Sequence, residues 1–236
     1  MSSINELERA IRDVNLGDII EECVITFEDD EAVIQAMDLT SSLYVETTAS
    51  AEFEDGQIGI GSLALFGKYL GFLKGSEVDI QQKENRLIVK PDTGTIVKYL
   101  LAEVDLIPSF NEEWGNDILT KELENYGKSM KLQKSSVDSC LKYFGLFTPN
   151  SMYFEVDKKG LVTLHGGKET DHIFIVDLGK IKGVDPCVVK VYGKHLTPVL
   201  SAIDYSSHPK LYLKEDEAVI IATDISSWML QPISNE

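Results

Sequence analysis

The 236-residue chain lacks the features that most directly mark an exported, membrane or disulfide-rich protein. No apolar run approaches the roughly 18 residues that a membrane-spanning helix needs. The first residues, MSSINELERAIRDVN, are charged and amphipathic and contain no signal-peptide hydrophobic segment. Cys23, Cys140 and Cys187 are far apart and form no CxxC pair. An odd number of cysteines without an export signal favours a reducing, intracellular compartment.

Basic residues are also scarce, since 22 Lys and Arg stand against 39 Asp and Glu and the formal net charge is −17. Taken alone, this charge argues against a nucleic-acid partner, because contacts with phosphates need Lys and Arg. The net charge does not say where the basic residues lie, however, so their positions matter more than their number. The apolar content of 43% is normal for a globular protein and suits one large domain or two ordinary ones.

The sequence has little that indicates catalysis or a cofactor. The phrase GIGSL (Gly59–Leu63) lacks the lysine and the further glycine of a phosphate-binding loop, so a strand-to-helix turn is the better interpretation. His165, Asp171 and His172 lie within HGGKETDH, but no other ligand is tied to them by spacing, and a hairpin loop explains the stretch. No Ser/His/Asp or Cys/His pattern is visible. We therefore expect no metal, no cofactor and no enzymatic activity; the least favoured alternative is a hydrolase that uses strand-end carboxylates.

Internal repetition is the main pattern in the sequence. DEAVIQAMD (Asp30–Asp38) and DEAVIIATD (Asp216–Asp224) agree at seven of nine positions. Each lies in a stretch that predicts a strand, a turn and a second strand, and two further stretches have the same form. The four predicted hairpins are Val24–Asp38, Val78–Asp92, Met152–Gly166 and Leu211–Asp224.

A helix candidate precedes each hairpin, because apolar residues recur there at spacings of three and four. The apolar stripes are Ile4, Leu7, Ile11 and Val14; Leu63, Phe66, Leu70 and Leu73; Val137, Leu141 and Phe144; and Val199, Leu200 and Ile203. Thr197 and Pro198 predict the N-cap and first residue of the fourth helix. Two helix ends, KYLGFL (Lys68–Leu73) and KYFGLF (Lys142–Phe147), are near copies. The chain thus repeats a helix-plus-hairpin unit four times.

The four units predict two similar domains, 1–103 and 129–236. The polar and acidic segment 104–128 is the predicted linker, with a short helix over Asn116–Tyr126. The predicted fold class is α+β, with two helices packed on antiparallel sheet in each domain.

Positive charge accompanies every predicted helix although the chain is acidic. The basic residues on these helices, or just before them, are Arg9, Arg12, Lys68, Lys131, Lys134, Lys142, Lys190 and Lys194. Glu6, Glu8 and Asp13 dilute the charge of the first helix, and helices commonly expose lysine. The periodicity alone therefore leaves a solvated surface and a DNA-facing surface both open.

Two phrases resemble a known family. DIIEECVITFEDDEAVIQAMD (Asp18–Asp38) resembles the first conserved stretch of DNA polymerase sliding clamps of the proliferating cell nuclear antigen type, in which a helix end runs into a hairpin finishing in a QAMD-like phrase. WMLQPI (Trp228–Ile233) resembles the C-terminal aromatic–x–Leu–x–Pro phrase of that family. The four units match the clamp domain, which contains two such units and occurs twice per chain. The long middle segment is closer to the T-even phage version.

The resemblance implies a homotrimeric ring of six similar domains that encircles double-stranded DNA without sequence preference. Such a ring tethers DNA polymerase and other replication proteins, works with a clamp loader, and has no membrane partner; its place is the cytoplasm or nucleoid, or the host cytoplasm for a phage protein. The DNA-facing residues carried over by match are Arg9, Arg12, Lys68, Lys131, Lys134, Lys142 and Lys194. The partner-peptide pocket carried over in the same way is Met37, Leu39, Leu106, Ile107, Tyr205, Leu230, Gln231 and Pro232.

The sequence departs from the family in ways that predict a weaker or more one-sided DNA contact. Clamps usually begin with a short strand, whereas here the first helix starts near Ser3. Ser201 stands where other clamps carry a lysine on the fourth helix. The alternative function is a clamp-fold interaction module, or an acidic decoy for polymerase, that does not encircle DNA. The alternative role of Leu230 and Tyr205 is to pack in the hydrophobic core of the second domain.

Overall fold

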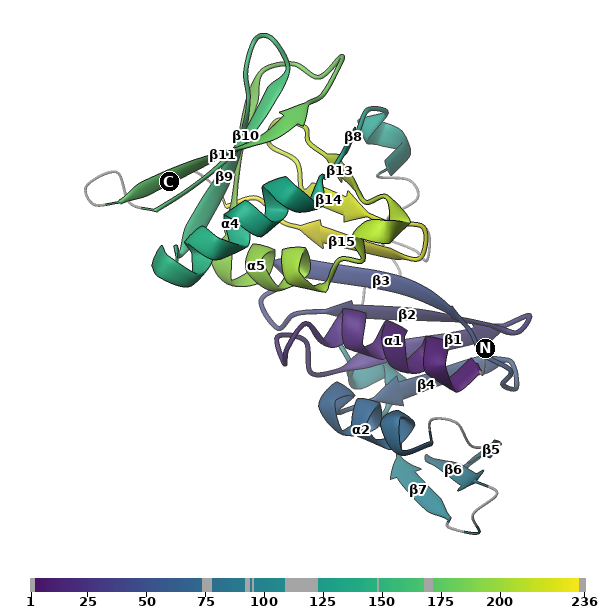
Figure 1. The fold of residues 1–236 in the computed structure, drawn as a ribbon. Coiled ribbons are helices and arrows are strands. Elements are labelled where there is room, and N and C mark those ends of the chain that lie inside the picture. The colour runs from purple at the N-terminus through teal and green to yellow at the C-terminus, as the bar shows by residue number, and fades with distance from the viewer. Residues whose placement is uncertain are drawn as a thin grey trace. The chain divides into compact units, whose positions relative to one another are not determined.

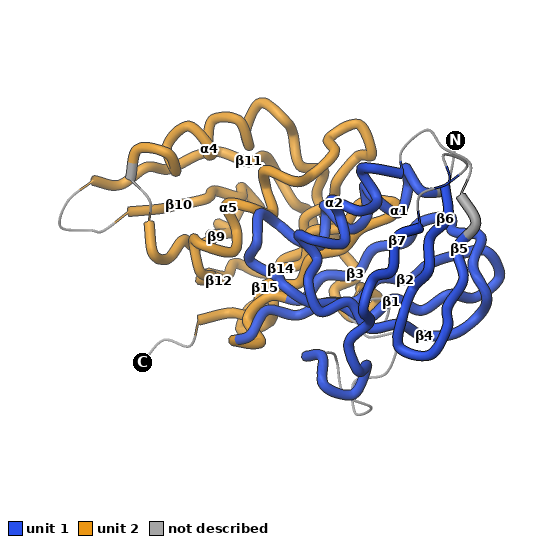
Figure 2. Tube along the Cα trace, turned by 90° about the horizontal axis from the view of Figure 1, so that it is seen from below, with its two compact units in different colours: residues 1–39, 44–113 blue, residues 40–43, 114–236 orange. Residues whose placement is uncertain are grey.

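The computed structural model describes residues 3–73, 78–91, 94, 96–108, 123–147, 149–167 and 172–233. The chain forms two compact units, coloured separately in Figure 2. Unit 1 comprises Met1–Leu39 and Tyr44–Glu113, and unit 2 comprises Thr40–Leu43 and Trp114–Glu236.

Unit 1 has the order helix, four strands, helix, three strands (Figure 1). Its elements are α1 (Ser3–Asn15), β1 (Cys23–Glu28), β2 (Glu31–Met37), β3 (Leu43–Ser50), β4 (Gly56–Ile60), α2 (Leu63–Leu73), β5 (Val78–Lys83), β6 (Arg86–Pro91), β7 (Val97–Leu100) and the 3-10 helix η1 (Val104–Leu106). The first predicted hairpin is β1–β2 and the second is β5–β6, with Glu84 and Asn85 at the turn as expected.

Unit 2 repeats this order after one additional strand. Its elements are β8 (Met130–Lys131), α4 (Lys134–Phe147), β9 (Ser151–Val156), β10 (Leu161–Gly167), β11 (Ile173–Lys180), β12 (Cys187–Tyr192), α5 (Gly193–Ala202), the 3-10 helix η2 (Tyr205–Ser207), β13 (Lys210–Tyr212), β14 (Val219–Ala222) and β15 (Ser226–Leu230). The third and fourth predicted hairpins are β9–β10 and β13–β14.

The strand order is the same in the two units. The four strands after the first helix are ordered β4-β1-β2-β3 in unit 1 and β12-β9-β10-β11 in unit 2, all antiparallel. The last three strands are ordered β5-β6-β7 and β13-β14-β15. The predicted α+β class, with two similar domains of helices on antiparallel sheet, is confirmed.

The helices pack on the sheets through the predicted apolar stripes. Ile4, Leu7, Ile11 and Val14 of α1 are buried, as are Leu63, Phe66, Leu70 and Leu73 of α2. In each unit the two helices lie side by side over the strands (Figure 1). The α1–α2 contact is close, because a Cβ added at Gly67 would lie 3.6 Å from Ile11 Cγ2. No helix in the described ranges has the length and apolarity needed to span a bilayer.

The GIGSL phrase is a strand-to-helix turn, as interpreted. β4 ends at Ile60, α2 begins at Leu63, and the Leu65 N–H donates to Ser62 Oγ at 3.3 Å. Gly59 is required by a close approach, since an added Cβ would lie 2.5 Å from the Ala102 carbonyl oxygen. A backbone hydrogen bond holds the same two residues together, because the Ala102 N–H donates to Gly59 O at 2.9 Å.

The predicted start of the fourth helix is wrong. α5 begins at Gly193, four residues before Thr197, and Pro198 lies inside it. The additional turn forms because His195 and Leu196 are buried at 2% and 0% exposure, and this burial outweighs the one backbone hydrogen bond that proline cannot donate. The predicted helix Asn116–Tyr126 lies outside the described residues except for 123–126, which are helical.

Candidate nucleic-acid interface and partner-binding residues

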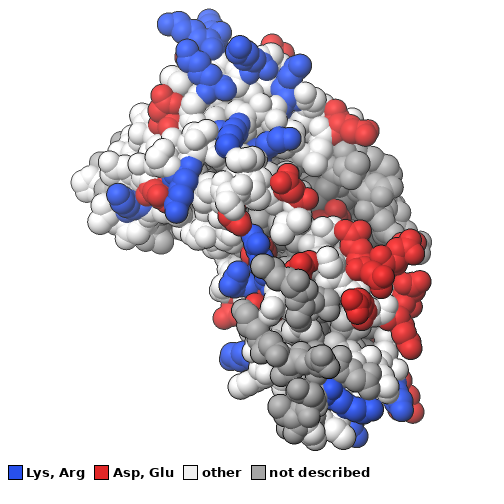
Figure 3. Space-filling view, turned by 45° about the vertical axis from the view of Figure 1, so that its right-hand side comes forward, with Lys and Arg blue, Asp and Glu red and all other residues white. Residues whose placement is uncertain are grey.

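The four long helices have a charge unlike that of the whole chain. α1, α2, α4 and α5 together carry six Lys and Arg against four Asp and Glu, a balance of +2, whereas the chain carries −17. On the face displayed in Figure 3, many acidic side chains gather in one group, whereas elsewhere basic and acidic side chains lie side by side. The helices are therefore better suited to meet a polyanion than the average surface of the chain.

In unit 1 the predicted DNA-facing residues lie on neighbouring helices. Arg9 and Arg12 are three residues apart on α1, with Arg9 half-buried and Arg12 exposed. Lys68 is exposed on α2, off the buried stripe, as expected. Because α1 packs against α2, the structure brings these three side chains onto the helix layer of one unit.

In unit 2 the predicted lysines divide between helix and strand. Lys134 and Lys142 are exposed on α4, and Lys194 is exposed on α5 with its Nζ 5.5 Å from the centre of the Tyr192 ring. Lys131 instead lies in β8, where its Nζ is 2.8 Å from His208 Nδ1. Lys131 thus belongs to a strand and is held by a neighbouring side chain.

Tyr205, predicted for the partner pocket, lies at the helix pair of unit 2. It lines an open depression of about 590 Å³ between α4 and α5, together with Lys134 and Asp138. Its hydroxyl donates to Leu200 O at 2.8 Å. Burial, followed by the nearby Asp138 charge, raises the pKa of the Tyr205 phenol above its ordinary value, so it remains a donor at neutral pH. Tyr205 therefore anchors the end of α5.

The four partner-pocket residues of unit 1 differ in accessibility. Leu39, just after β2, is 80% exposed, and Leu106 in η1 is 79% exposed. Met37 at the end of β2 is half-buried. Ile107 is 5% exposed, and its Cδ1 would lie 2.8 Å from a Cβ added at Gly59. Leu39 and Leu106 are therefore the residues of this group that can meet a partner directly.

The three C-terminal residues predicted for the pocket are tied to unit 2. Leu230 is the last residue of β15, pairs with Val219 and is 1% exposed. This burial agrees with the alternative role of Leu230 in the core of the second domain. The Gln231 N–H donates to Ser42 O at 2.9 Å, and the Ile233 N–H donates to Lys190 O at 2.7 Å. Pro232 is half-buried between these two bonds. The segment after β15 is thus fixed in place by its backbone.

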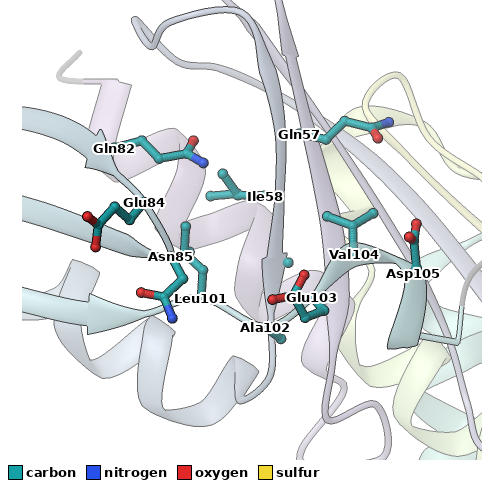
Figure 4. Close-up of a pocket in the computed structure, with 11 residues that line it drawn as sticks. Gln57, Ile58, Gln82, Glu84, Asn85, Leu101, Ala102, Glu103, Val104 and Asp105 are labelled. Atoms are coloured by element: carbon teal, nitrogen blue, oxygen red, sulfur yellow. The ribbon is translucent and has the colours of Figure 1, made fainter.

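A hydrolase that uses carboxylates would need acidic side chains that converge in a pocket. A polar depression in unit 1 is lined by several of them. It has a volume of about 390 Å³ and lies between β4, the β5–β6 turn and the segment after β7. Figure 4 shows Glu84 from the β5–β6 turn and Glu103 and Asp105 from the segment after β7, and the three carboxylates do not point toward a common position. The arrangement provides no paired acid and base, so it does not support the hydrolase alternative.

The histidines of HGGKETDH do not form a metal site in the described part of the chain. His165 is 7% exposed, stacks on Tyr153 with 4.4 Å between ring centres, and its Nε2 lies 2.7 Å from Thr163 Oγ1. Burial lowers the pKa of His165, although the Glu155 carboxylate at 3.3 Å opposes the shift. Asp171 lies outside the described residues. His165 is therefore a packed sheet residue.

No protein-family model and no curated protein sequence matches the chain. Solved structures match it over 99% of its length. The proliferating cell nuclear antigen of Thermococcus kodakaraensis has a TM-score of 0.70 and 16% identity, over 98% of that chain. A. fulgidus PCNA, solved with the C-terminal region of FEN-1, has a TM-score of 0.72 and 11% identity, over 97% of that chain. The DNA polymerase III β subunit of Pseudomonas aeruginosa has a TM-score of 0.76 and 13% identity, over 64% of that chain. These matches show a sliding-clamp fold.

Proposed function

We propose, on the basis of this clamp fold, that the protein is a DNA polymerase processivity factor. Three copies form a ring that encircles duplex DNA, and the ring holds polymerase and other replication proteins on the template. The function is non-enzymatic and uses no cofactor. The observation that carries the proposal is the balance of +2 on the four helices of a chain with a net charge of −17.

The charge distribution suits sliding. Lysines and arginines on helices contact phosphates without reading bases, so the contact is independent of sequence and weak enough to move. Closure of the ring, rather than affinity, prevents loss of the DNA. Acidic surface elsewhere repels DNA from the remaining faces. The three cysteines are buried free thiols, which agrees with a reducing, intracellular setting.

Partner proteins are expected to bind through short peptides. The A. fulgidus clamp was solved with the C-terminal region of FEN-1, and a Helicobacter pylori β clamp with a DNA ligase peptide. In this chain Leu39 and Leu106 are the exposed apolar residues that would receive such a segment from polymerase or a clamp loader. Met37 of unit 1, which belongs to the same predicted pocket, is half-buried.

The charge of α1 favours a second candidate function. α1 carries Glu6, Glu8 and Asp13 against Arg9 and Arg12, so it alone among the four helices is net negative. A monomeric clamp-fold interaction module, or an acidic decoy for polymerase, needs no positive helix layer. It would bind partner peptides without encircling DNA.

Solution mass separates the two functions. We expect a species of three times 26.3 kDa at micromolar protein, measured by light scattering after size exclusion. The same measurement at nanomolar protein gives the strength of the ring. A species of 26.3 kDa at every concentration would exclude the ring and leave the monomeric module.

A further inference from the structure

Two loops lie together at the same end of the four-stranded sheet in each unit. By strand order, the β1–β2 turn and the β3–β4 connection of unit 1 correspond to the β9–β10 turn and the β11–β12 connection of unit 2. In unit 1 the Ala51 N–H donates to Asp30 O at 2.9 Å and joins the two loops. In unit 2 the Ile181 N–H donates to Gly160 O at 2.9 Å in the same place. The two pairs of loops are therefore structurally equivalent.

The loops of unit 1, residues 28–31 and 51–55, are strongly acidic and are called the acidic loops below. They contain seven exposed Asp and Glu and no Lys or Arg. Phe53 stacks on Phe27 with 4.4 Å between the ring centres, which holds the second loop against the end of β1. None of the seven carboxylates forms an ion pair within the described part of the chain. This concentration of negative charge repels itself and favours a cationic partner.

The loops of unit 2, residues 157–160 and 180–186, have the opposite charge and are called the basic loops below (Figure 1). They contain four exposed lysines against two aspartates. The exposed Lys128 lies along the second loop, because a Cβ added at Gly183 would lie 3.5 Å from Lys128 Cε. In the described ranges none of the five ammonium groups forms a hydrogen bond or an ion pair. The five lysines are Lys128, Lys158, Lys159, Lys180 and Lys182.

The aspartate nearest these lysines has a role within the turn. Asp157 Oδ1 accepts from the Leu161 N–H at 2.8 Å and from the Lys159 N–H at 2.7 Å. The Leu161 hydrogen bond is the main reason that the pKa of Asp157 lies below its ordinary value, and the charges of Lys159 and Lys180 contribute to the same shift. Asp157 therefore stays ionised and shapes the turn. With five lysines and two aspartates, the basic loops keep an excess charge of +3.

The acidic loops lie at the far end of β2 from the proposed partner site. β2 begins at Glu31, next to these loops, and ends at Met37, two residues before Leu39. Because a strand rises about 3.4 Å per residue, Met37 lies roughly 20 Å from Glu31. A partner that covers the acidic loops therefore leaves Leu39 accessible.

A second copy of the chain has the charges that both pairs of loops need. The acidic loops carry −7 and the basic loops +3, so unlike pairs attract and like pairs repel. A nucleic acid fits less well, because the acidic loops repel phosphates. The basic loops also contain no arginine to bind a phosphate through two hydrogen bonds and no aromatic residue to stack on a base.

The symmetry of the proposed ring gives this attraction a closed form. Six similar domains around one axis place equivalent loops on one side of the ring, alternately acidic and basic. A second ring, turned over by a twofold axis, brings each acidic pair onto a basic pair. Such a contact is self-complementary, so it stops at two rings and does not grow into a filament.

We propose that the basic loops of unit 2 bind the acidic loops of unit 1 in a second copy, so that two rings stack through the side away from Leu39. This inference rests on the proposed ring and adds an interaction surface to it.

The stack should be reversible and sensitive to salt. Single exposed ion pairs are weak, and the stack depends on six loop contacts that act together. We expect a species of six times 26.3 kDa at about 0.01 M salt, where the Debye length is about 30 Å, and of three times 26.3 kDa at about 0.15 M, where it is about 8 Å. Light scattering after size exclusion measures both.

Charge reversal in the basic loops should abolish the stack. Lys159→Glu with Lys182→Glu changes the charge of these loops from +3 to −1, so the variant ring presents only negative loops. We expect it to need at least about tenfold more protein to stack at low salt. The matched control is Lys83→Glu with Lys210→Glu, which makes the same charge change at exposed residues outside the four loops and should stack as wild type. At about 0.15 M salt every variant should keep the trimer and the thermal unfolding of the wild type.

A second variant allows a mixing experiment. Lysine in place of Glu28, Glu31, Glu52 and Glu54 changes the acidic loops from −7 to +1, so this ring presents only positive loops and should not stack alone. Mixed at low salt, the two variant rings attract each other at every contact, and the species of six times 26.3 kDa should return.

The outcomes separate the stack from the ring. Wild-type stacking by Lys159→Glu with Lys182→Glu, equal loss in the control variant, or no recovery on mixing would overturn the loop contact. So would a trimer that never doubles its mass at low salt, which would leave the ring intact. Weaker duplex-DNA binding by Lys159→Glu with Lys182→Glu, together with an unchanged stack, would assign the basic loops to nucleic acid and overturn the proposal. A wild-type chain that is monomeric throughout would overturn the ring itself.

Discussion

Replacing Lys68 and Lys142 together with glutamate should strongly weaken duplex-DNA binding at moderate salt and abolish polymerase stimulation. The two lysines occupy the same place in KYLGFL and KYFGLF, and both are exposed on helices that pack over their sheets. The proposed trimer would carry six such residues, so the change would replace six phosphate-attracting charges with six repelling ones. The slope of log affinity against log salt should fall by about 0.9 for each phosphate that the variant no longer neutralises. The measurement is duplex-DNA affinity from about 50 to 200 mM salt, with polymerase stimulation as the functional readout.

The control for this double variant changes charge without touching a helix. Lys158 and Lys159 are exposed at the turn between β9 and β10, and glutamate at both gives the same change in net charge. Exposed lysines contribute little to stability, so both double variants should fold and keep their self-association. Equal loss of DNA binding in the two double variants would show that only the net charge matters. It would exclude Lys68 and Lys142 as DNA-contacting residues.

Leu39→Glu should leave the fold intact, whereas Leu230→Glu should disrupt it. Leu39 is 80% exposed, so Leu39→Glu should change the free energy of unfolding by about 0.5 kcal/mol or less while removing an apolar side chain from the proposed partner site. Leu230 is 1% exposed in β15, so Leu230→Glu buries a charge and should unfold unit 2. The two leucines therefore separate a binding role from a core role.

The test combines thermal unfolding with binding of a fluorescent peptide that carries aliphatic and aromatic anchors. Leu39→Glu should bind the peptide at least about tenfold more weakly, because an apolar anchor contributes about 1.5–3 kcal/mol when fully buried. Ile225→Glu, at another partly exposed apolar residue, should bind normally. Undiminished binding by Leu39→Glu would exclude Leu39 from the partner site, and a stable Leu230→Glu would contradict its place in the core.

The repeated elements could be predicted from the sequence because their signals are local. Ile4, Leu7 and Ile11 recur with the period of a helix, and the β5–β6 hairpin shows a turn at Glu84 between two runs. Each pattern needs only neighbouring residues to be read. The start of α5 could not be predicted in this way, because the burial of Leu196 depends on tertiary packing that overrides the signal of Pro198.

The candidate sites were less predictable because exposure depends on residues far away in the chain. The resemblance of WMLQPI assigns Leu230 to a partner pocket, yet Trp228, Met229 and Leu230 are all buried, so both faces of β15 are covered. The neighbours of β7 and β11 among the described strands depend on strand pairing, which composition does not reveal. The exposure of the helix lysines was easier to predict from the sequence. The apolar stripe of an amphipathic helix also defines its polar side, and Lys68 and Lys142 lie outside the stripe.

Retention on circular DNA tests the ring most directly. The protein is mixed with a nicked circular plasmid, its subunits are joined with an amine-reactive cross-linker, and the complex is washed at about 1 M salt, where phosphate contacts are screened. The proposed ring predicts that cross-linked protein stays on the circle through the wash and is released when a restriction enzyme linearises the DNA. Release from the circle as readily as from linear DNA would contradict encirclement.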